Sequence, residues 1–305
     1  MQTDPDRVAV IVLNWNRRAD TLRCLAALDV VSEPPIDVFM VDNGSSDGSE
    51  AGVRTTFPKV RVVQNGANLG FAEGNNVAIR MALEADYPWI MLLNNDTTVA
   101  PDAISELLRP LQDDPAVGIS SGAIVYMDAP DTVWSAGGHV DRRRGRVTTD
   151  WLDQPLTALP DATYLVDHVT GCAMLVRAEA IRDAGVLDPR FFMYYEETEW
   201  CARISRARYR VVVNPKAVIR HDIQPDVQLG SSSIAYYMTR NHLLFLRATR
   251  APLSAWLYTL FWQVRTLASL YLRSPSPARA RGRTPMLRAI RDFMLGRFGQ
   301  LQNVR

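Results

Sequence analysis

Four short apolar runs alternate with segments of helical character in the first half of this chain. The runs are often β-branched, each ends in a polar loop, and they cover residues 8–13, 36–41, 60–63 and 89–93. Such runs are typical of strands buried on both faces of a parallel sheet. Apolar residues recur at helical spacing in segments 21–28, 71–85 and 102–111, and Pro101 favours a helix start before the last of them. The alternation predicts an α/β fold with a mainly parallel central sheet and right-handed crossovers.

The composition limits the class of protein. With 47% hydrophobic and 22% charged residues in 305 positions, the chain resembles a soluble globular protein. Its formal net charge of +1 excludes a globally basic nucleic-acid binder, so we expect no nucleic-acid partner. Cys24, Cys172 and Cys201 are too few for a disulfide framework and favour a reducing compartment. Residues 1–7 lack the apolar core of a secretion signal, so a cytoplasmic location is expected.

Polar loops follow three of the predicted strands. They read Asn14-Trp15-Asn16, Asp42-Asn43-Gly44-Ser45-Ser46-Asp47-Gly48-Ser49 and Asn94-Asn95-Asp96-Thr97. Any one of them could be an ordinary turn, because Asn, Asp, Gly and Ser are turn formers. In parallel sheets, however, ligands bind at the carboxyl ends of the strands, and all three loops fall on that edge. The three loops together predict a binding site.

The residue types in these loops suit a nucleotide and a metal-bound diphosphate. Asp42 can accept hydrogen bonds from a ribose or a base, and the glycines after it allow close backbone approach. Asp96 offers a hard oxygen to Mg²⁺ or Mn²⁺, which bridges diphosphate oxygens. The first strand is not followed by Gly-x-Gly-x-x-Gly, and the chain contains no Gly-x-x-x-x-Gly-Lys. Dinucleotide dehydrogenases and P-loop hydrolases are therefore disfavoured.

A segment rich in acids and aromatic residues, 191–200, follows in the second half of the chain. Glu196, Glu197 and Glu199 lie among phenylalanine, tyrosine and tryptophan side chains. Aromatic rings can hold a sugar while one carboxylate removes a proton from its hydroxyl group. The alternative is a solvated helix start, because acids are favoured at the positive end of the helix dipole.

Seven ordered motifs resemble those of the family-two inverting glycosyltransferases over about residues 7 to 245. They are Asn14-Trp15-Asn16; Asp42-Asn43-Gly44-Ser45; Asn68-Leu69-Gly70-Phe71-Ala72-Glu73-Gly74-Asn75-Asn76; Asn94-Asn95-Asp96; Thr170-Gly171-Cys172; Phe191 to Glu199; and His221. The third motif and the paired glutamates are most similar to the bacterial rhamnosyltransferase branch.

The resemblance implies a nucleotide-diphospho-sugar transferase fold of the GT-A type. A catalytic domain is expected over residues 1–250 and a helical extension over residues 251–305. The family positions that bind the donor correspond to Asn14, Asn16, Asp42, Asn43, Gly70, Asn75, Asn94, Asn95 and Asp96. Asp96 and His221 match metal-ligand positions, and Glu197 matches the general base. Asn94 departs from the family, because many members have an aspartate there, and an amide is a weaker metal ligand.

The implied activity is transfer of a sugar, best matched by L-rhamnose from dTDP-rhamnose, onto a hydroxyl of a glycan or lipid-linked acceptor in cell-surface polysaccharide synthesis. Donors based on UDP-hexose or UDP-galactofuranose remain alternatives. So does a non-catalytic sugar-nucleotide-binding subunit of a glycan assembly complex, although the intact Glu197 and Asp96 argue against it. A nucleotidyltransferase expects a glycine-rich loop after the first strand, and Asn14-Trp15-Asn16 has no glycine.

Several further residues are candidates for acceptor or phosphate contacts. They are Trp134, Glu196, and Arg240 with Asn241, the last two on a helix predicted to start near Ser231. The run Arg142-Arg143-Arg144 fits either a solvated loop or a contact with a lipid diphosphate.

The C-terminal fifth differs in character. Segment 253–272 reads as an amphipathic helix whose wet face carries Thr259, Gln263, Thr266, Ser269 and Arg273. A linker over residues 274–277 and six further arginines follow, namely Arg279, Arg281, Arg283, Arg288, Arg291 and Arg297. The pattern fits peripheral docking on the anionic inner face of a membrane. A hairpin packed on the catalytic domain, or on a second subunit of a homodimer, fits equally well.

Overall fold

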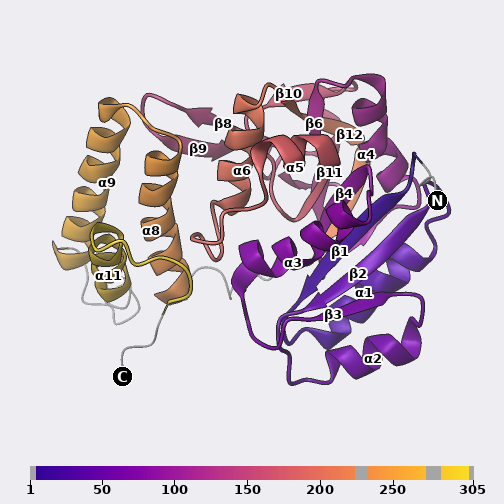
Figure 1. Cartoon of the computed structure of the whole chain (residues 1–305). Helices are drawn as coiled ribbons and strands as arrows, with labels where there is room; N and C mark the ends of the chain where they lie inside the picture. Colours follow the sequence, from indigo (N-terminus) through magenta and orange to yellow (C-terminus); the bar gives the residue numbers. More distant parts are fainter. Residues whose placement is uncertain (1–4, 224–231, 273–282, 302–305) are drawn as a thin grey trace.

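The computed structural model describes residues 5–223, 232–272 and 283–301 (Figure 1). Its strands are β1 (Val8–Asn14), β2 (Ile36–Asp42), β3 (Arg61–Gln64), β4 (Trp89–Asn94), β5 (Thr97–Val99), β6 (Val117–Tyr126), β7 (Val133–Ser135), β8 (Gly138–Asp141), β9 (Arg146–Thr149), β10 (Tyr164–Val166), β11 (Ala173–Arg177) and β12 (Arg210–His221). Its α-helices are α1 (Arg18–Asp29), α2 (Ser49–Thr56), α3 (Gly70–Glu84), α4 (Ala103–Asp113), α5 (Ala178–Ala184), α6 (Glu196–Arg206), α8 (Ser232–Ala248), α9 (Leu253–Leu272) and α11 (Arg283–Met294).

The four predicted strands form the parallel part of the main sheet, in the order β4-β1-β2-β3. The chain builds outward from β1 through β2 to β3 and then returns to the other side of β1 with β4. The strand order therefore reverses beside β1, where ligands bind in open α/β sheets. This confirms the predicted fold class and brings the carboxyl ends of β1, β2 and β4 together.

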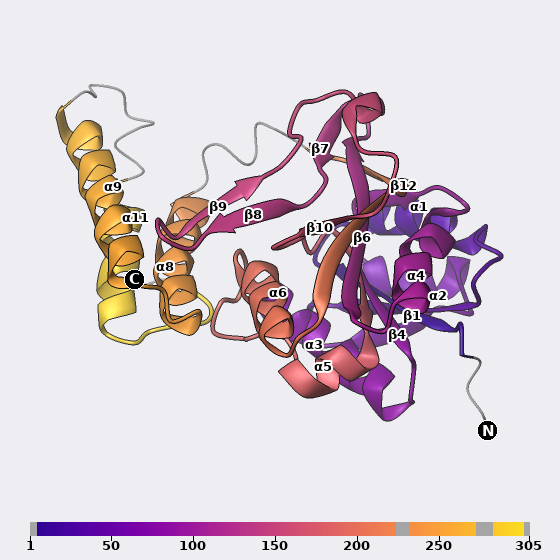
Figure 2. The same cartoon turned by 90° about the horizontal axis from the view of Figure 1, so that it is seen from above.

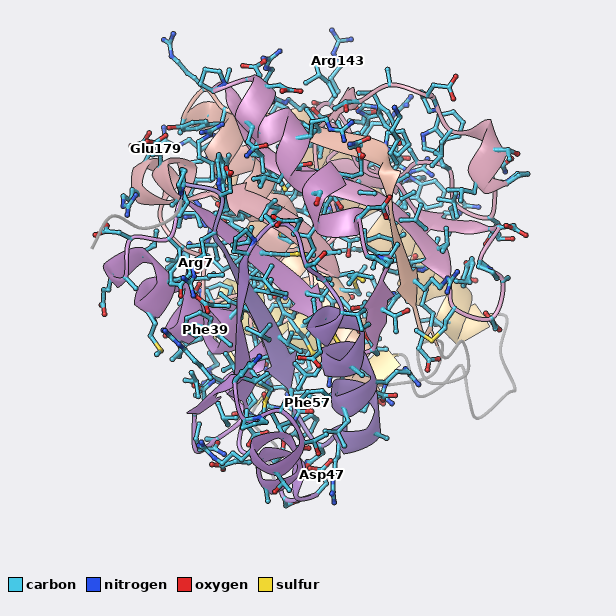
Figure 3. All side chains as sticks on the ribbon, turned by 90° about the vertical axis from the view of Figure 1, so that its right-hand side faces the viewer. Arg7, Phe39, Asp47, Phe57, Arg143 and Glu179 are labelled. Carbon is cyan, nitrogen blue, oxygen red and sulfur yellow. The ribbon has the colours of Figure 1, made fainter. Side chains whose placement is uncertain are left out.

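Both faces of this sheet are buried, as the unbroken apolar runs predict. In β1, Val8, Val10 and Val12 pack against α1, α2 and α4, whereas Ala9 and Ile11 face the core that contains α3, α5 and α6. Phe39 of β2 belongs to the second of these cores, and Figure 3 shows it within the sheet. Two hydrophobic layers thus fix the strands that carry the polar loops.

The second half of the sheet extends the order to β10-β12-β6-β11-β4. Strand β11 runs antiparallel to both β4 and β6, while β12 runs parallel to β6. Strand β12 also pairs with the short β5, and this pairing sets His221 opposite Thr97. A residue 125 positions after Asp96 in the sequence is thereby placed beside it.

The C-terminal helices stand to one side of the sheet, next to the β8–β9 hairpin (Figures 1 and 2). Phe191 packs with Leu244, Phe245 and Ala255, so α8 and the start of α9 share a core with the segment before α6. Helix α11 packs on α8, where Ala289 contacts the cluster of Tyr236 and Tyr237. The predicted C-terminal helices are confirmed. The domain boundary at residue 250 and the extension over residues 251–305 stay predictions.

The prediction of which residues of α9 are exposed to solvent is wrong in part. Thr259 and Gln263 are only 3% and 8% exposed, because they lie on the side of α9 that faces the rest of the protein. Thr266 and Ser269 are exposed, as predicted. Arg273, the linker, Arg279 and Arg281 lie outside the described residues. In the part of the chain that the structure describes, no helix is both long and apolar enough to cross a membrane.

Candidate functional site

Asp42 is the centre of a hydrogen-bond network at the carboxyl end of β2. Its carboxylate accepts from Asn14 Nδ2 (2.8 Å), from the Ser45 backbone N–H (2.9 Å) and from Gln64 Nε2 (2.7 Å). Burial alone would raise the pKa of Asp42, but the hydrogen bonds from Ser45 and Gln64 outweigh it and lower the pKa. Asp42 is therefore a fixed anion whose surroundings hold it in one orientation.

The neighbouring polar residues lock the three loops to each other. Asn95 donates to Asn14 Oδ1 (3.1 Å), which joins the β4 loop to β1. Asn16 adopts a left-handed backbone with φ of 53° and accepts a hydrogen bond from the Ser46 N–H (2.8 Å). Asn43 donates to the Gly70 carbonyl (3.0 Å), which joins β2 to the start of α3. The predicted donor residues of these loops do lie together.

Gly70 joins the start of α3 to the segment before α6. Its φ is +80°, and a Cβ atom built there would lie 2.5 Å from the Phe192 carbonyl oxygen. The same carbonyl accepts a hydrogen bond from the Phe71 N–H (2.6 Å). Asn75, one turn further on, is buried and donates to the Phe71 carbonyl (2.9 Å). Gly70 and Asn75 thus have structural contacts, and their direct contact with a donor stays a prediction.

We expect Gly70→Ala to lower the free energy of unfolding by roughly 2–5 kcal/mol, because a left-handed alanine and a steric clash with Phe192 act together. Gly66→Ala is the matched control. Gly66 also has a positive φ, of 71°, but a Cβ atom added to it would meet no other atom within 4 Å. It should therefore lose only about 1–2 kcal/mol. Urea unfolding of both variants gives the comparison, and equal losses would mean that Phe192 moves aside freely.

Asp96 and His221 meet at the other side of the strand-end site. Asp96 Oδ1 lies 3.1 Å from His221 Nε2, and the ring of Trp134 packs edge-on against His221 with ring centroids 4.8 Å apart. Burial alone would lower the pKa of His221, but Cys172 and Asp96 outweigh it and raise the pKa to about 10. The structure thus brings together Asp96, His221 and Trp134, three candidates from distant parts of the sequence.

The surroundings of Asp96 and His221 fit a hard divalent cation. Asp96 Oδ1 is buried against His221 Nε2, and the buried His221 Nδ1 has no hydrogen-bond partner among the described residues. The described residues contain no cluster of three or more His, Cys, Asp or Glu side chains suited to a metal. A cation held here would need further oxygens, which the diphosphate of a donor can supply. Asn94 precedes Asp96 by two positions and is half-buried.

Glu196 and Glu197 begin α6, and each has a buried Oε2 atom without a hydrogen-bond partner in the described structure. Burial raises the pKa of Glu197 to about 7. Burial and the charge of Glu197 raise the pKa of Glu196 well above its usual range. Glu199 differs, because it forms an ion pair with Arg203 at 2.8 Å. Glu197, which is more exposed than Glu196, is thus the better placed of the two free acids to meet a substrate.

The loop before α6 is held in an unusual conformation by α8. Phe192, Tyr194 and Tyr195 all have positive φ values, of 68°, 68° and 71°. Asn241 Nδ2 donates to the carbonyls of Phe191, Met193 and Tyr194 at 2.7–2.9 Å. Backbone strain of this kind persists only where neighbouring contacts fix it. Asn241 thereby holds the loop that leads into Glu197 in one conformation.

Arg240 is buried beside Asn241 and donates to three backbone carbonyls. These belong to Gly299 (2.7 Å), Arg190 (3.3 Å) and Phe191 (3.0 Å). Its guanidinium group also stacks over Tyr236 and Tyr237. The predicted phosphate contact of Arg240 and Asn241 does not fit these contacts, because donors that are already paired inside the protein have little capacity left for a ligand.

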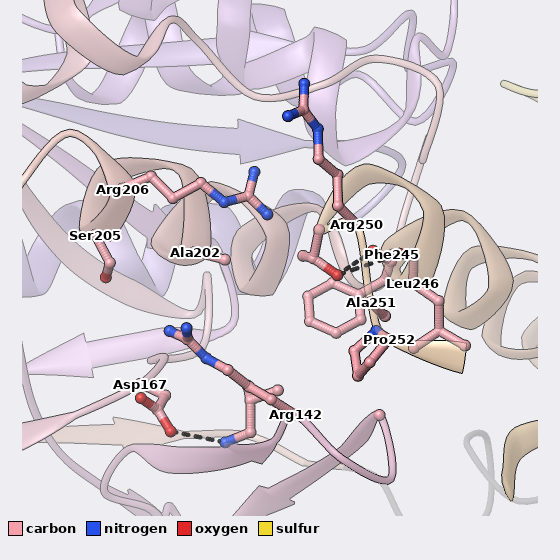
Figure 4. Close-up of a pocket in the computed structure, with 13 residues that line it drawn as sticks. Arg142, Asp167, Ala202, Ser205, Arg206, Phe245, Leu246, Arg250, Ala251 and Pro252 are labelled. Carbon is pink, nitrogen blue, oxygen red and sulfur yellow. Dashed lines mark hydrogen bonds between the residues drawn. The ribbon is translucent and has the colours of Figure 1, made fainter. Parts of the chain in front are cut away.

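Arg142 lies in the turn between β8 and β9, where it lines a cavity of about 210 Å³ (Figure 4). Arg206 and Arg250 also line this cavity, together with Phe245 and Leu246. Ala202, Ser205 and Arg206 of α6 line the cavity, and Ala202 lies about 7.5 Å of helix length beyond Glu197. The cavity is distinct from the strand-end site, and a diphosphate contact of Arg142, Arg143 or Arg144 stays a prediction.

Some functional candidates escaped the sequence reasoning. Gln64 ends β3 on the same sheet edge, so the rule that selected the other three loops could have found it. Arg17 places its guanidinium 4.0 Å from Asp96, and Thr21 donates to Asn14 Oδ1 (2.8 Å). Both follow β1 at the start of α1, and only the folded chain shows that they face the site.

Comparisons with known proteins agree with this geometry. The chain is 27% identical over 289 residues to N-acetylglucosaminyl-diphospho-decaprenol L-rhamnosyltransferase from Mycobacterium tuberculosis, which covers 88% of this chain and 92% of that protein. It is 22% identical to dTDP-rhamnosyl transferase RfbF from Shigella flexneri, over 81% of this chain and 82% of that protein.

Two solved structures share the fold. The mannosyltransferase PcManGT from Pyrobaculum calidifontis, in complex with GDP-Man and Mn²⁺, has a TM-score of 0.58 and 19% identity over 98% of this chain and 77% of its own. GalNAc-T7 with UDP, GalNAc and Mn²⁺ has a TM-score of 0.61 and 12% identity over 96% of this chain and 57% of its own. Both are neighbours of the GT-A type, which confirms the predicted fold.

The sequence profile of one family, described as glycosyl transferase family 2, matches residues 9–185. That span holds the parallel part of the main sheet and the loops with Asp42 and Asp96, whereas Glu197 and His221 lie beyond its end. The predicted resemblance is therefore confirmed: this chain belongs to glycosyl transferase family 2.

Proposed function

We propose that this glycosyltransferase moves L-rhamnose from dTDP-rhamnose onto an acceptor hydroxyl with inversion at the anomeric carbon. The observation that carries the reaction class is the pair of buried acids at the start of α6, of which Glu197 has a pKa raised to about 7. The two relatives whose names specify rhamnosyl transfer support the sugar. The name of the mycobacterial relative supports a lipid-linked acceptor. We propose in addition a role in cell-surface polysaccharide synthesis on the cytoplasmic side of the membrane.

In this reaction the Glu197 carboxylate accepts the proton of the acceptor hydroxyl. The oxygen then attacks the anomeric carbon from the face opposite the diphosphate, and the bond to the diphosphate breaks. A carboxylate with a pKa near the working pH combines a large ionised fraction with useful basicity, and proton transfer of this kind contributes about 10²–10⁴-fold. Asp96 and His221 would hold a divalent cation, which would neutralise the charge of the leaving diphosphate.

The donor side of the reaction depends on fixed polar groups. Asp42 is buried and oriented by Asn14, Ser45 and Gln64, and this network fixes the loops after β1 and β2, against which we propose that the nucleotide binds. Asn95 and Asn16 tie the adjacent loops to the same network. Such preorganised contacts raise the rate by positioning the donor for in-line attack.

A panel of nucleotide sugars tests the proposal. We expect release of dTDP from dTDP-rhamnose to exceed release from UDP-hexoses and UDP-galactofuranose, with a lipid-linked acceptor increasing the rate. NMR of the product should show the anomeric configuration opposite to that of the donor. A preference for a UDP-sugar would mean that this sugar, and not rhamnose, is the one transferred. Donor binding without turnover under all conditions would instead favour the non-catalytic subunit.

We expect turnover to depend on pH through Glu197. Only the ionised carboxylate can accept a proton, so kcat should rise with pH and level off above a pKa of about 7. Below that value the rate should fall about tenfold per pH unit. A pH profile of kcat at saturating donor measures this fall of the rate at low pH. A rate that stays flat from pH 5 to 8 would exclude Glu197 as the base.

A further inference from the structure

Helix α9 turns a row of large apolar side chains away from the rest of the protein. These residues share one helical face, since they recur at spacings of three or four, and their exposed fractions lie between 45% and 72%: Leu253, Leu257, Leu260, Phe261 and Val264. The opposite face, with Ala255, Thr259 and Gln263, is buried. Helix α9 lies at the edge of the molecule opposite β1–β3, and no other described element covers its outer side (Figures 1 and 2).

This arrangement reverses the usual polarity of a surface helix. A single exposed leucine needs no explanation, whereas a contiguous apolar row marks an interaction surface. The buried Thr259 Oγ1 and Gln263 Oε1 atoms have no hydrogen-bond partner among the described residues, so polar atoms face the protein while apolar ones face outward. The orientation of α9 is fixed by its contacts with the hairpin, where Ser254 Oγ donates to the Arg143 carbonyl (2.9 Å).

The charge of this part of the chain indicates what covers the apolar row. Residues 251–305 contain nine arginines and one acidic residue, Asp292, whereas residues 1–250 contain 25 basic and 32 acidic residues. Helix α9 itself contains no acidic residue. Two copies joined through this face would bring like charges together, while an anionic surface carries the opposite charge.

Cationic and aromatic side chains flank the apolar row. The guanidinium of Arg265 lies 4.4 Å from the ring of Trp262, and that of Arg144 lies 5.9 Å from the ring of Tyr258. Arg143, at the tip of the adjacent hairpin, projects outward from the surface (Figure 3). Aromatic rings and arginines beside an apolar face are typical of helices that lie in the headgroup region of a bilayer.

We propose that the outward face of α9 inserts into the surface of an anionic phospholipid bilayer, with the helix lying in the membrane plane. Leu257, Phe261 and Val264 enter the acyl boundary, and the arginines around them meet headgroup phosphates. This docking is independent of the sugar that the enzyme transfers.

Vesicle co-sedimentation of the full-length protein tests the proposal. We expect binding to vesicles of phosphatidylglycerol and phosphatidylcholine at low salt, weaker binding at 0.5 M salt, and little binding to phosphatidylcholine alone. The triple variant Leu257→Ser, Phe261→Ser and Val264→Ser should bind at least tenfold more weakly, with donor hydrolysis unchanged.

A matched control replaces three equally exposed apolar residues elsewhere, Val30→Ser, Leu152→Ser and Leu165→Ser, and should bind vesicles like the wild type. All substitutions are at exposed positions, and circular dichroism melts check that each variant is folded. Equal loss in both triple variants would overturn the proposal. So would wild-type protein that ignores anionic vesicles at low salt, or a wild-type dimer in sedimentation that the α9 variant alone converts to a monomer without affecting vesicle binding.

Discussion

Replacing Glu197 by glutamine is expected to reduce kcat by about 10²–10⁴-fold while donor affinity changes little. The amide keeps the size of the side chain but has no basic lone pair to accept the acceptor proton. Glu197 lies at the start of α6 and is not one of the residues that hydrogen-bond to Asp42, so we expect the loss in kcat and not in donor affinity. The measurement is kcat with saturating acceptor, together with the Kd of the donor by calorimetry.

Two neighbouring acids provide the controls. Glu196→Gln removes a carboxylate of the same type one residue earlier, and it should leave more activity than Glu197→Gln because Glu196 is more deeply buried. Glu199→Gln disrupts the ion pair with Arg203, so it should lower the free energy of unfolding and leave kcat nearly unchanged. If Glu197→Gln keeps kcat within about tenfold of the wild type, the base lies elsewhere, and Glu196 is the next candidate.

Replacing Asp96 by alanine is expected to lower the activity by about 10²-fold or more. The residual activity should no longer depend on a divalent metal. The wild type should lose turnover in excess chelator and regain it with Mn²⁺ or Mg²⁺. His221→Ala should retain part of the activity and require a higher metal concentration. A second measurement is the rise in Tm that Mn²⁺ causes in the presence of dTDP, which Asp96→Ala should remove.

Asn94→Asp is an informative companion variant. It restores the carboxylate that many family members carry, so it should lower the Mn²⁺ concentration needed for half-maximal activity, because a carboxylate is a stronger ligand than an amide. Full wild-type activity in excess chelator would contradict the metal requirement. The leaving diphosphate would then depend on an arginine, and Arg17 is the candidate, because its guanidinium lies 4.0 Å from Asp96 whereas Arg240 is buried and paired with backbone carbonyls.

Local pattern was sufficient for the first half of the molecule. Buried β-branched runs separated by helical segments allow few arrangements, so β1, β2, β3 and β4 and the polar loops after them could be identified from sequence. The same reasoning placed Asp42, Asn14 and Asn95 at one sheet edge, where their hydrogen bonds now join them. The ordered motifs added the family, because seven of them in sequence are specific.

Contacts between residues far apart in the sequence decided the positions of the other site residues. His221 reaches Asp96 only because β12 pairs with β5, and no local signal specifies a pairing between strands more than 100 residues apart. Arg240 and Asn241 are candidates for phosphate contacts in the sequence, yet tertiary packing directs their donors to the carbonyls before Glu197.

Helix α9 shows the same division most clearly. The sequence alone determined that residues 253–272 form a helix with one polar and one apolar side. It could not determine which side faces water, because helical periodicity defines the relative direction of two faces and not their surroundings. The tertiary structure decided this by packing Thr259 and Gln263 inward, and so it left Leu257, Phe261 and Val264 exposed.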